Sequence, residues 1–319
     1  MVIVCWILSF AICFCAMPAV IRLSWHIGAV DVPRDWRRMH CKSTPRAGGI
    51  AILSAFLVSC AVVVGESSDI RCAMGAGILM LILGLCDDIL SFGAWLKLFF
   101  QAAIALAAVL SIGMTSPLSL FLSVLWVLLL GNAHNMIDGL DGLFAGCASI
   151  EGTALAVALM MCGFSAQAYA SVILVGGCLA FLCFNRHPAH IFAGDCGSGT
   201  VGFLLGLLSL PLLRTGGGRF LAVLLIFAYP LTDLFTAVLR RTLRGQSPFV
   251  ADRAHLHHRV YATGISVRGC VWVFRCLVLV LGTLGVLLVD MRFLPFSSLL
   301  CMGIAWLLMG LRRFILKFS

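Results

Sequence analysis

Four polar residues recur at every third position in the stretch "GNAHNMIDGLDGLFAG", residues 131–146: Asn132, Asn135, Asp138 and Asp141. On an α-helix three residues turn through about 300°, so neighbouring members lie about 60° apart and together cover half of the circumference. Carboxylate and amide oxygens are hard ligands, which suit Mg²⁺ better than zinc. The stretch follows the apolar run "FLSVLWVLLL". It therefore predicts a polar, metal-binding rim at the foot of a membrane span.

A second acidic group lies in "LGLCDDILSFGAWLKLFFQ", where Asp87 and Asp88 end one apolar run and Lys97 begins the next. Adjacent carboxylates repel each other, so such a pair is tolerated in water, near cations or around a metal ion. Because this pair directly adjoins an apolar run, we favour a site over simple solvation.

A third group is "NRHPAHIFAGDCGSGTVGF", in which Asp195 is followed by Gly197, Ser198 and Gly199. Small residues at a helix N-terminus leave backbone N–H groups free, which favours phosphate binding there. A GxGD aspartyl protease motif is excluded because Phe192 stands where that motif requires glycine. We therefore expect a phosphate seat at this helix start.

A fourth group is "RRTLRGQSPFVADRAHLHHRV", with Arg253, His255, His257 and His258. Three histidines could bind zinc, but cysteine ligands are absent nearby and His257 and His258 cannot share a helical face. A phosphate-rich substrate, joined to the acids by a metal ion, accounts for the group better. Acids that bind Mg²⁺, together with basic residues, are the parts that phosphoryl transfer requires.

The elements that position these residues are transmembrane helices. The 319 residues are 62% hydrophobic and 11% charged, with a mean hydropathy of +1.10, which is typical of a polytopic membrane protein. We predict an all-α fold of about eleven spans. They are residues 2–23, 47–65, 70–86, 95–113, 117–133, 143–163, 167–184, 198–213, 219–239, 269–289 and 295–316.

The basic residues set the expected orientation, because cytoplasmic loops are enriched in Lys and Arg. One face would carry only Arg71, Arg214, Arg219 and Arg292, so we place it and Met1 outside and the C-terminus in the cytoplasm. The net charge of +9 reflects this bias and contact with membrane lipids rather than nucleic-acid binding. We expect one transmembrane domain, residues 1–319. Its active-site loops would face the cytoplasm at residues 24–46, 85–97, 132–143, 185–199 and 240–268.

The motifs together resemble the polyprenyl-phosphate N-acetylhexosamine-1-phosphate transferases of glycosyltransferase family 4. The similarity covers nearly the whole chain, in the family's order: "HCKSTPRAGG", "DD", "NAHNMIDGLDGL", "PAHIFAGDCGS", "YPLTD" and "SPFVADRAHLHH". It implies transfer of a sugar-1-phosphate from a UDP-N-acetylhexosamine to undecaprenyl phosphate, with release of UMP, at the bacterial cytoplasmic (inner) membrane. This reaction starts lipid-linked glycans such as O antigen or teichoic acid.

Residue roles follow from the resemblance by motif. Asp195 and Asn135 would ligate Mg²⁺, with Mn²⁺ as the alternative, bridging the UDP-sugar diphosphate. Lys97 would contact that diphosphate. Asn185 and Phe192 match positions that hold the nucleoside, with Phe192 stacking on uracil.

The remaining matched residues fall into three groups. The catalytic acids would be Asp87, Asp88, Asp138 and Asp141. The residues that contact phosphate and sugar would be His255, His257 and His258, with Asn132 and Arg253 as further substrate-binding residues. The first loop would place His40 and Lys42 near the lipid phosphate.

The chain departs from the phospho-MurNAc-pentapeptide enzymes of the family. Those enzymes are similar to one another in a lysine three residues after the "DD" pair and in three consecutive histidines. This chain has Ser91 and "HLHH" instead, as in the N-acetylglucosamine branch. The exact sugar and a homodimer stay open. The main rival is a cation-coupled transporter, which would use ionisable groups within spans; Glu151 and Asp233 are the residues of that kind. A scaffold without chemistry is disfavoured because all the matched acids are present.

Overall fold

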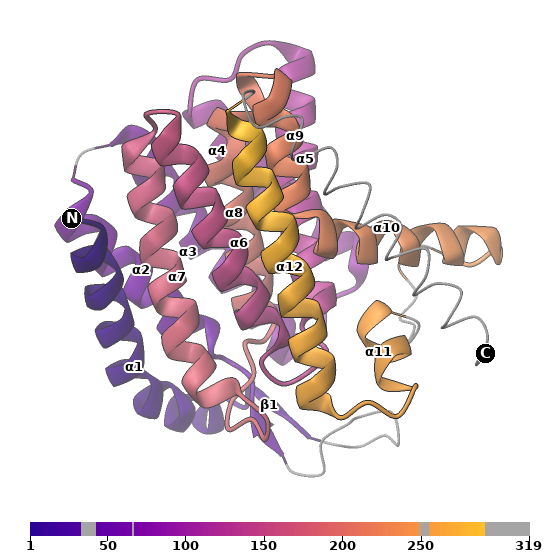
Figure 1. Cartoon of the computed structure of the whole chain (residues 1–319). Helices are drawn as coiled ribbons and strands as arrows, with labels where there is room; N and C mark the ends of the chain where they lie inside the picture. Colours follow the sequence, from indigo (N-terminus) through magenta and orange to yellow (C-terminus); the bar gives the residue numbers. More distant parts are fainter. Residues whose placement is uncertain (33–42, 66, 248, 250–254, 291–319) are drawn as a thin grey trace.

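The computed structural model describes residues 1–32, 43–65, 67–247, 249 and 255–290, which form a helical bundle (Figure 1). The helices are α1 (Val2–His26), α2 (Gly49–Val63), α3 (Ser68–Leu90), α4 (Ala94–Ser111), α5 (Pro117–Ile137), α6 (Leu143–Met161), α7 (Ser165–Asn185), α8 (Asp195–Arg214), α9 (Gly217–Ile226), α10 (Ala228–Leu243), α11 (Leu256–Tyr261) and α12 (Val267–Val289).

The fold is helical, as the sequence predicted, and it also contains one short pair of strands. The strands β1 (Val30–Asp31) and β2 (Thr44–Pro45) pair antiparallel, with Val30 opposite Pro45. Within the described residues, eight helices are long and apolar enough to cross a membrane, and α2 is apolar but only 15 residues long. The protein is thus a multi-pass membrane protein. The span predicted at residues 295–316 lies outside the described residues.

One predicted span, residues 219–239, consists of two helices. The axes of α9 and α10 differ by 72°, and α10 extends sideways from the bundle (Figure 1). Pro230 lies in the first turn of α10, where its ring would clash with the carbonyl of Ile226 if α9 continued. Proline therefore explains why this apolar run does not cross as one straight helix.

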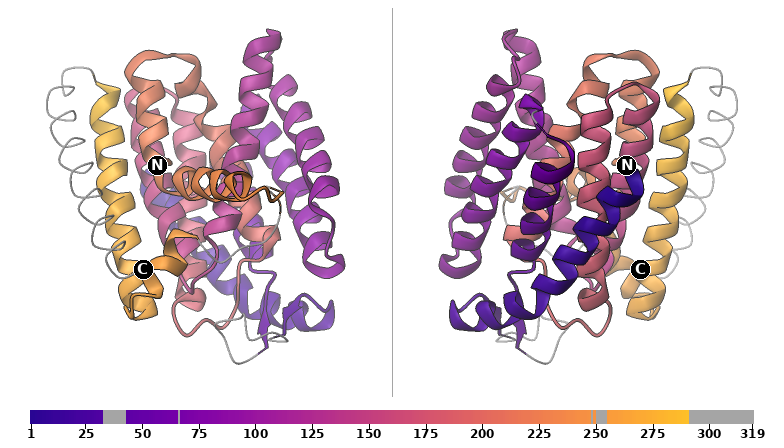
Figure 2. Two further views of the ribbon diagram at one scale, coloured as in Figure 1. Left: turned by 90° about the vertical axis from the view of Figure 1, so that its right-hand side faces the viewer. Right: turned by 90° about the vertical axis from the view of Figure 1, so that its left-hand side faces the viewer.

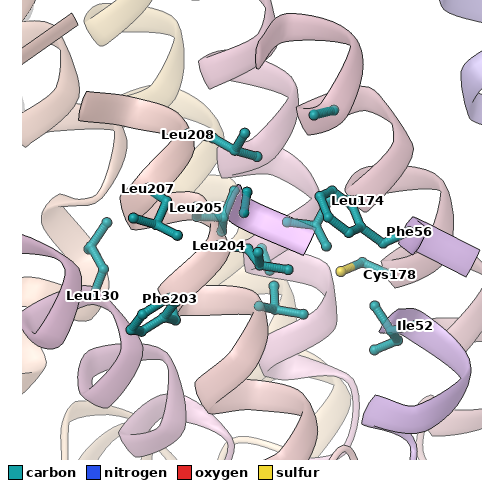
Figure 3. Packing of buried hydrophobic residues seen from close by; sticks show 14 of the residues in the cluster. Ile52, Phe56, Leu130, Leu174, Cys178, Phe203, Leu204, Leu205, Leu207 and Leu208 are labelled. Carbon is teal, nitrogen blue, oxygen red and sulfur yellow. The ribbon is translucent and has the colours of Figure 1, made fainter. Parts of the chain in front are cut away.

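Helix α8 is the most deeply buried span. Its side chains Phe203, Leu204 and Leu208 pack against Ile52 and Phe56 of α2 and against Leu130, Leu174 and Cys178 of α5 and α7 (Figure 3). Glycines permit this proximity. A Cβ at Gly49 or Gly84 would overlap the backbone of α8 at Gly197 or Cys196. Close backbone approach through small residues is usual between helices in lipid, and here it fixes the first turn of α8.

The polar ends of several helices meet at one end of the bundle. Helices α3, α5 and α7 end there, and α4, α6 and α8 begin there, as the alternating chain direction requires. The β1–β2 pair covers the same end, since Phe192 N donates to Pro45 O at 2.8 Å. Figure 2 shows the β1–β2 pair and the α7–α8 connection together below the bundle. This end carries the candidate site.

Candidate active site

Lys97 links two of the predicted acids. Its ammonium group contacts Asp87 Oδ2 at 2.9 Å and also bonds to Asp195 Oδ2. Asn135 Nδ2 donates to the same Asp195 oxygen at 3.3 Å. Helices α3, α4, α5 and α8 therefore each supply one member of a connected polar group. Residues up to 108 positions apart in sequence meet at one point, as an active site requires.

Asp88, next to Asp87, has a different environment. Its Oδ1 and Oδ2 accept the backbone N–H groups of Asp195 and Cys196, each at 3.1 Å, and Arg46 Nε lies 3.4 Å from Oδ1. The Asp88 side chain is 1% exposed. Asp88, a residue of α3, therefore caps the N-terminus of α8.

This arrangement corrects the phosphate seat expected at Gly197–Gly199. The first two N–H groups of α8 bond to Asp88, and those of Gly197 and Ser198 bond to Gly194 O at 3.0 and 2.9 Å. The helix N-terminus already has an anion, but it is a protein carboxylate. The expectation was wrong because a distant aspartate satisfies these donors.

The Asp138 carboxyl group has no hydrogen-bond partner among the described residues, unlike the carboxyl groups of the other matched acids. It follows the last turn of α5. Burial of this carboxyl group disfavours its charged form, and the charges of Asp195, Asp88 and Asp141 add repulsion. Together they raise the pKa of Asp138 to about 8. An unpaired carboxyl with such a pKa attracts either a proton or a cation.

Asp141 organises the α7–α8 connection. Its Oδ2 lies 2.7 Å from His187 Nδ1 and accepts Ala189 N–H at 3.1 Å. The structure thus places Asp141 at the same end as Asp138, within the 138–142 loop. Its carboxylate is only 19% exposed and already has partners.

Asn185 and Phe192, both predicted to hold a nucleoside, occupy different settings. Asn185 is 1% exposed. Its Oδ1 accepts Gly142 N–H and its Nδ2 donates to Ile191 O, each at 2.9 Å. The Asn185 amide therefore joins the 138–142 loop to the α7–α8 connection. Its oxygen and nitrogen are both occupied by these backbone bonds rather than exposed to a ligand. Phe192 is half-buried beside β2, where its ring is more accessible than the Asn185 amide.

The histidine group lies beside the 138–142 loop. His255 Nδ1 is 2.8 Å from Asp233 Oδ2, and Asp233 Oδ1 accepts Leu256 N–H at 2.7 Å. A side chain at Gly139 would overlap the His257 ring, which is fully buried and whose two nitrogens have no hydrogen-bond partner within the described chain.

Burial, with repulsion from His258 and His255, lowers the pKa of His257 to about 3. His257 is therefore a neutral imidazole at pH 7. Its ring lies 4.2 Å from that of His258, centroid to centroid. Buried polar atoms without partners are rare in native proteins and often mark the place of a ligand or water.

The other predicted residues contribute less. Asn132 Nδ2 donates to Gln101 Oε1 at 3.0 Å, one helical turn away from Asn135, and so joins α5 to α4. His40, Lys42 and Arg253 lie outside the described residues. Arg46 was missed as a site residue, although "TPRAGG" belongs to the first motif; it also donates to the backbone carbonyl of Asp88.

Ser198 was cited only as a small residue in the expected phosphate seat. Its hydroxyl lies 2.9 Å from Asn135 Oδ1. That contact sets the amide orientation in which Nδ2 faces Asp195. Asn135 would have to turn this amide to offer its oxygen together with Asp195.

The oxygen atoms at the site suit an open magnesium site better than a metal site that protein ligands enclose completely. Within the described chain, no three His, Cys, Asp or Glu side chains converge as metal ligands. Mg²⁺ is commonly held by one or two carboxylates, while substrate phosphates and water complete its shell. Asp195 already binds a cationic group, the Lys97 ammonium, and Asp138 lacks a partner. These hard oxygens suit a divalent ion whose remaining ligands are not supplied by the protein.

The two carboxylates that would suit a transporter both have histidine partners. Asp233 is bound to His255, as described above, and Glu151 Oε2 lies 2.7 Å from His134 Nε2. Both acids are fully buried. The transporter alternative is not supported.

Comparison with known proteins agrees with the motifs. The profile of glycosyl transferase family 4 matches residues 70–212. A probable undecaprenyl-phosphate N-acetylglucosaminyl 1-phosphate transferase of Bacillus subtilis (strain 168) is 33% identical over 286 residues, covering 84% of this chain and 79% of the relative.

Two further relatives carry similar names. A decaprenyl-phosphate N-acetylglucosaminephosphotransferase of Mycolicibacterium smegmatis (strain ATCC 700084 / mc(2)155) is 34% identical over 299 residues, covering 78% of this chain and 72% of the relative. An undecaprenyl-phosphate alpha-N-acetylglucosaminyl 1-phosphate transferase of Escherichia coli (strain K12) is 26% identical over 293 residues, covering 84% and 79%. The chain therefore belongs to glycosyl transferase family 4, and these three relatives are named as polyprenyl-phosphate N-acetylglucosamine-1-phosphate transferases.

Proposed function

We propose that this protein transfers N-acetylglucosamine-1-phosphate from UDP-N-acetylglucosamine to undecaprenyl phosphate and releases UMP. The reaction takes place at the cytoplasmic face of the bacterial inner membrane, requires Mg²⁺ or Mn²⁺, and starts a lipid-linked envelope glycan. The named relatives support the sugar-phosphate and polyprenyl-phosphate substrates. The single observation that carries the proposal is the meeting of Asp87, Lys97, Asn135 and Asp195 from four helices.

Lys97 is the residue that contacts the donor diphosphate. Its ammonium has three N–H donors, and the side chain is 16% exposed between two carboxylates. It can therefore donate to a phosphate oxygen while Asp87 holds its position. Positioning and neutralisation of charge supply most of the catalysis in phosphoryl transfer.

Asp195 and Asn135, with Asp138 beside them, are the residues that would hold the divalent ion. When bound, such an ion neutralises negative charge that develops on the diphosphate. Turning the Asn135 amide would release its bond to Asp195 and present its oxygen. Ser198 can then donate elsewhere, because Gly194 O also lies 2.9 Å from its hydroxyl.

Two matched residues act on the site through other residues. Asp88 holds the first turn of α8, so it positions Asp195. Asn185 holds Gly142 N and Ile191 O, so it positions the 138–142 loop and the approach to Phe192. We infer that both are positioning residues rather than substrate contacts.

The histidines complete the phosphate-binding surface. The neutral His257 ring beside Gly139 can donate one N–H and accept one hydrogen bond. His255 is oriented by Asp233, which holds its ring beside that of His257. This side of the site suits the sugar and phosphate of the donor.

The proposal is tested with purified protein in a lipid bilayer, undecaprenyl phosphate, Mg²⁺ and a panel of UDP-sugars. We expect UMP release with UDP-N-acetylglucosamine and its loss in Asp195→Asn. Asp69→Asn is the matched control, because Asp69 lies at the start of α3, at the opposite end of that helix from Asp87, where it accepts from Gln167. Absence of UMP with every donor, with folded protein and both decaprenyl and undecaprenyl acceptors, would overturn the function.

A further inference from the structure

An apolar groove runs along the outside of the bundle between α6, α7 and α12. Its volume is about 550 Å³, and its walls include Ile150, Val157, Leu279 and Val286. None of its lining residues belongs to α3, α4, α5 or α8, the helices that carry Lys97 and its partners. The groove is therefore distinct from the Lys97 cluster, and it reaches the candidate site only through Arg275, which contacts Gly142 of the 138–142 loop.

Arg275 is the one charged residue among those that line the groove. Its Nη2 donates to Gly142 O at 2.5 Å, while its buried Nε has no hydrogen-bond partner. Gly146 provides the space for the guanidinium, because a side chain there would overlap it. No carboxylate lies within ion-pair distance among the described residues. Arg275 is thus a positive charge in a membrane helix that has no counter-ion in the part of the chain that the structure describes.

The position of Arg275 at a helix N-terminus makes burial of its positive charge less favourable. Gly142 is the residue immediately before α6, so the guanidinium lies at the N-terminus of that helix. Helix N-termini carry partial positive charge and attract anions. Arg275 and the helix end therefore favour the same ligand, a group with negative charge.

Trp272 indicates the depth of this charge in the bilayer. It lies one turn before Arg275 on the groove wall and is 64% exposed. Exposed tryptophans gather at the membrane–water interface. From Trp272 to Val286 the groove follows α12 for fourteen residues, about 21 Å at the rise of an α-helix. One leaflet of the hydrocarbon core is about 15 Å deep, so the groove can hold a lipid tail below a headgroup at Arg275.

We propose that this groove binds one anionic phospholipid of the leaflet at the active-site end, with its phosphate at Arg275 and one tail along α12. A zwitterionic lipid fits less well because its own cation offsets the phosphate charge. The C-terminal segment, residues 291–319, has no Asp or Glu and four basic residues, so its side chains cannot neutralise Arg275.

Native mass spectrometry of the full chain tests the charge preference, with phosphatidylglycerol and phosphatidylcholine of identical tails as probes. We expect the first phosphatidylglycerol to bind about 5-fold more tightly, the effect of about one interfacial charge contact. Arg275→Leu should abolish the preference and Arg275→Lys should retain part of it. Arg259→Leu is the control for net charge, since Arg259 is exposed on α11. Equal binding of the two lipids to the wild-type protein, or an unchanged preference in a folded Arg275→Leu protein, overturns the proposal.

A phosphatidylglycerol with a photoreactive group in its tail tests the location without any variant. We expect cross-links to peptides that contain Val157 of α6 and Leu279 of α12. Cross-links that avoid both helices overturn the proposal, including the case in which residues 291–319 fill the groove.

Discussion

The Asp88 carboxylate holds the backbone N–H groups of Asp195 and Cys196, each at 3.1 Å, so the end of α3 caps the start of α8. Asp87, the preceding residue, binds Lys97 and Phe92 N–H instead. The two adjacent carboxylates therefore have different structural roles. One fixes the helix that carries Asp195, and the other fixes the cation beside it.

Replacement of Asp88 should reduce stability as well as activity. In Asp88→Asn, one of the two backbone N–H groups would face an amide N–H₂ in place of an acceptor. An unsatisfied buried donor costs about 1–3 kcal/mol, so the midpoint of thermal unfolding should fall. Asp87→Asn is the matched control and should unfold close to the wild-type temperature, because the Asp87 side chain is 13% exposed and can bond to water, whereas that of Asp88 is 1% exposed. Equal losses of stability in the two variants would contradict the capping role.

Asp87→Asn should instead lower turnover by about 100-fold, the effect of misplacing a catalytic group. We expect Asp87 to orient Lys97 and the attacking oxygen, because the acceptor phosphate has a second pKa near 6 and is already mostly dianionic at pH 7. Turnover at saturating Mg²⁺ should then be flat above pH 7 in both proteins. Recovery of the variant at raised pH would show that Asp87 acts as a base.

The binding of Mg²⁺ should release a proton from Asp138. Its pKa of about 8 without metal means that this carboxyl is mostly protonated at pH 7, and a divalent cation nearby favours the carboxylate. The apparent affinity for Mg²⁺ should therefore rise from pH 7 to pH 8.5. Calorimetry at pH 7 in two buffers of different ionisation enthalpy measures the released proton, which Asp138→Asn should remove. An affinity independent of pH would exclude this coupling.

The same carboxyl should affect the metal-free protein in a defined direction. The folded-state pKa of Asp138 lies above its unfolded value near 3.9. Its contribution to stability is fully present below pH 3.9 and is lost as pH rises through about 8. Metal-free wild-type protein should therefore lose more stability between pH 6 and pH 9 than Asp138→Asn does. Unfolding midpoints at the two pH values provide the measurement.

The gathering of the acids could be predicted from sequence, whereas their partners could not. Apolar runs and short connections placed Asp88, Asp138 and Asp195 at helix ends on one face, and the structure confirms that Asp88 meets Asp195. Hydropathy reports which segments are buried, but it does not report which side chain meets which donor. Asp88 lies 107 positions from the N–H group it caps, so only the packing of α3 on α8 determines that bond.

The break before α10 was missed for a related reason. Residues 219–239 satisfy the length and hydropathy of a span, but Pro230 interrupts the helix regardless of hydropathy. The proline was the available signal. The buried position of the Asn185 amide and the lack of partners at His257 had no local signal, because both depend on loops from elsewhere in the chain.

His134 provides a final test, because it directly precedes Asn135 and is fully buried. Its Nδ1 lies 2.9 Å from Leu130 O and its Nε2 lies 2.7 Å from Glu151 Oε2, while Glu151 Oε1 has no hydrogen-bond partner in the described part of the chain. Removal of one member of such a buried pair leaves the other without its partner and typically costs about 3–5 kcal/mol. We expect His134→Leu and Glu151→Met each to lower the unfolding midpoint strongly.

The double variant His134→Leu/Glu151→Met should be more stable than either single variant, because two apolar side chains of similar size can replace a buried polar pair at little cost. A double-mutant cycle on unfolding measures this coupling. If the pair also fixes the last turn of α5, the double variant should require more Mg²⁺ for half-maximal activity than the wild type. The requirement should rise because the double variant folds normally but lacks the hydrogen bonds by which His134 holds the backbone next to Asn135. Simple addition of the two single losses would contradict the coupling, and an unchanged Mg²⁺ requirement would confine the pair to a structural role.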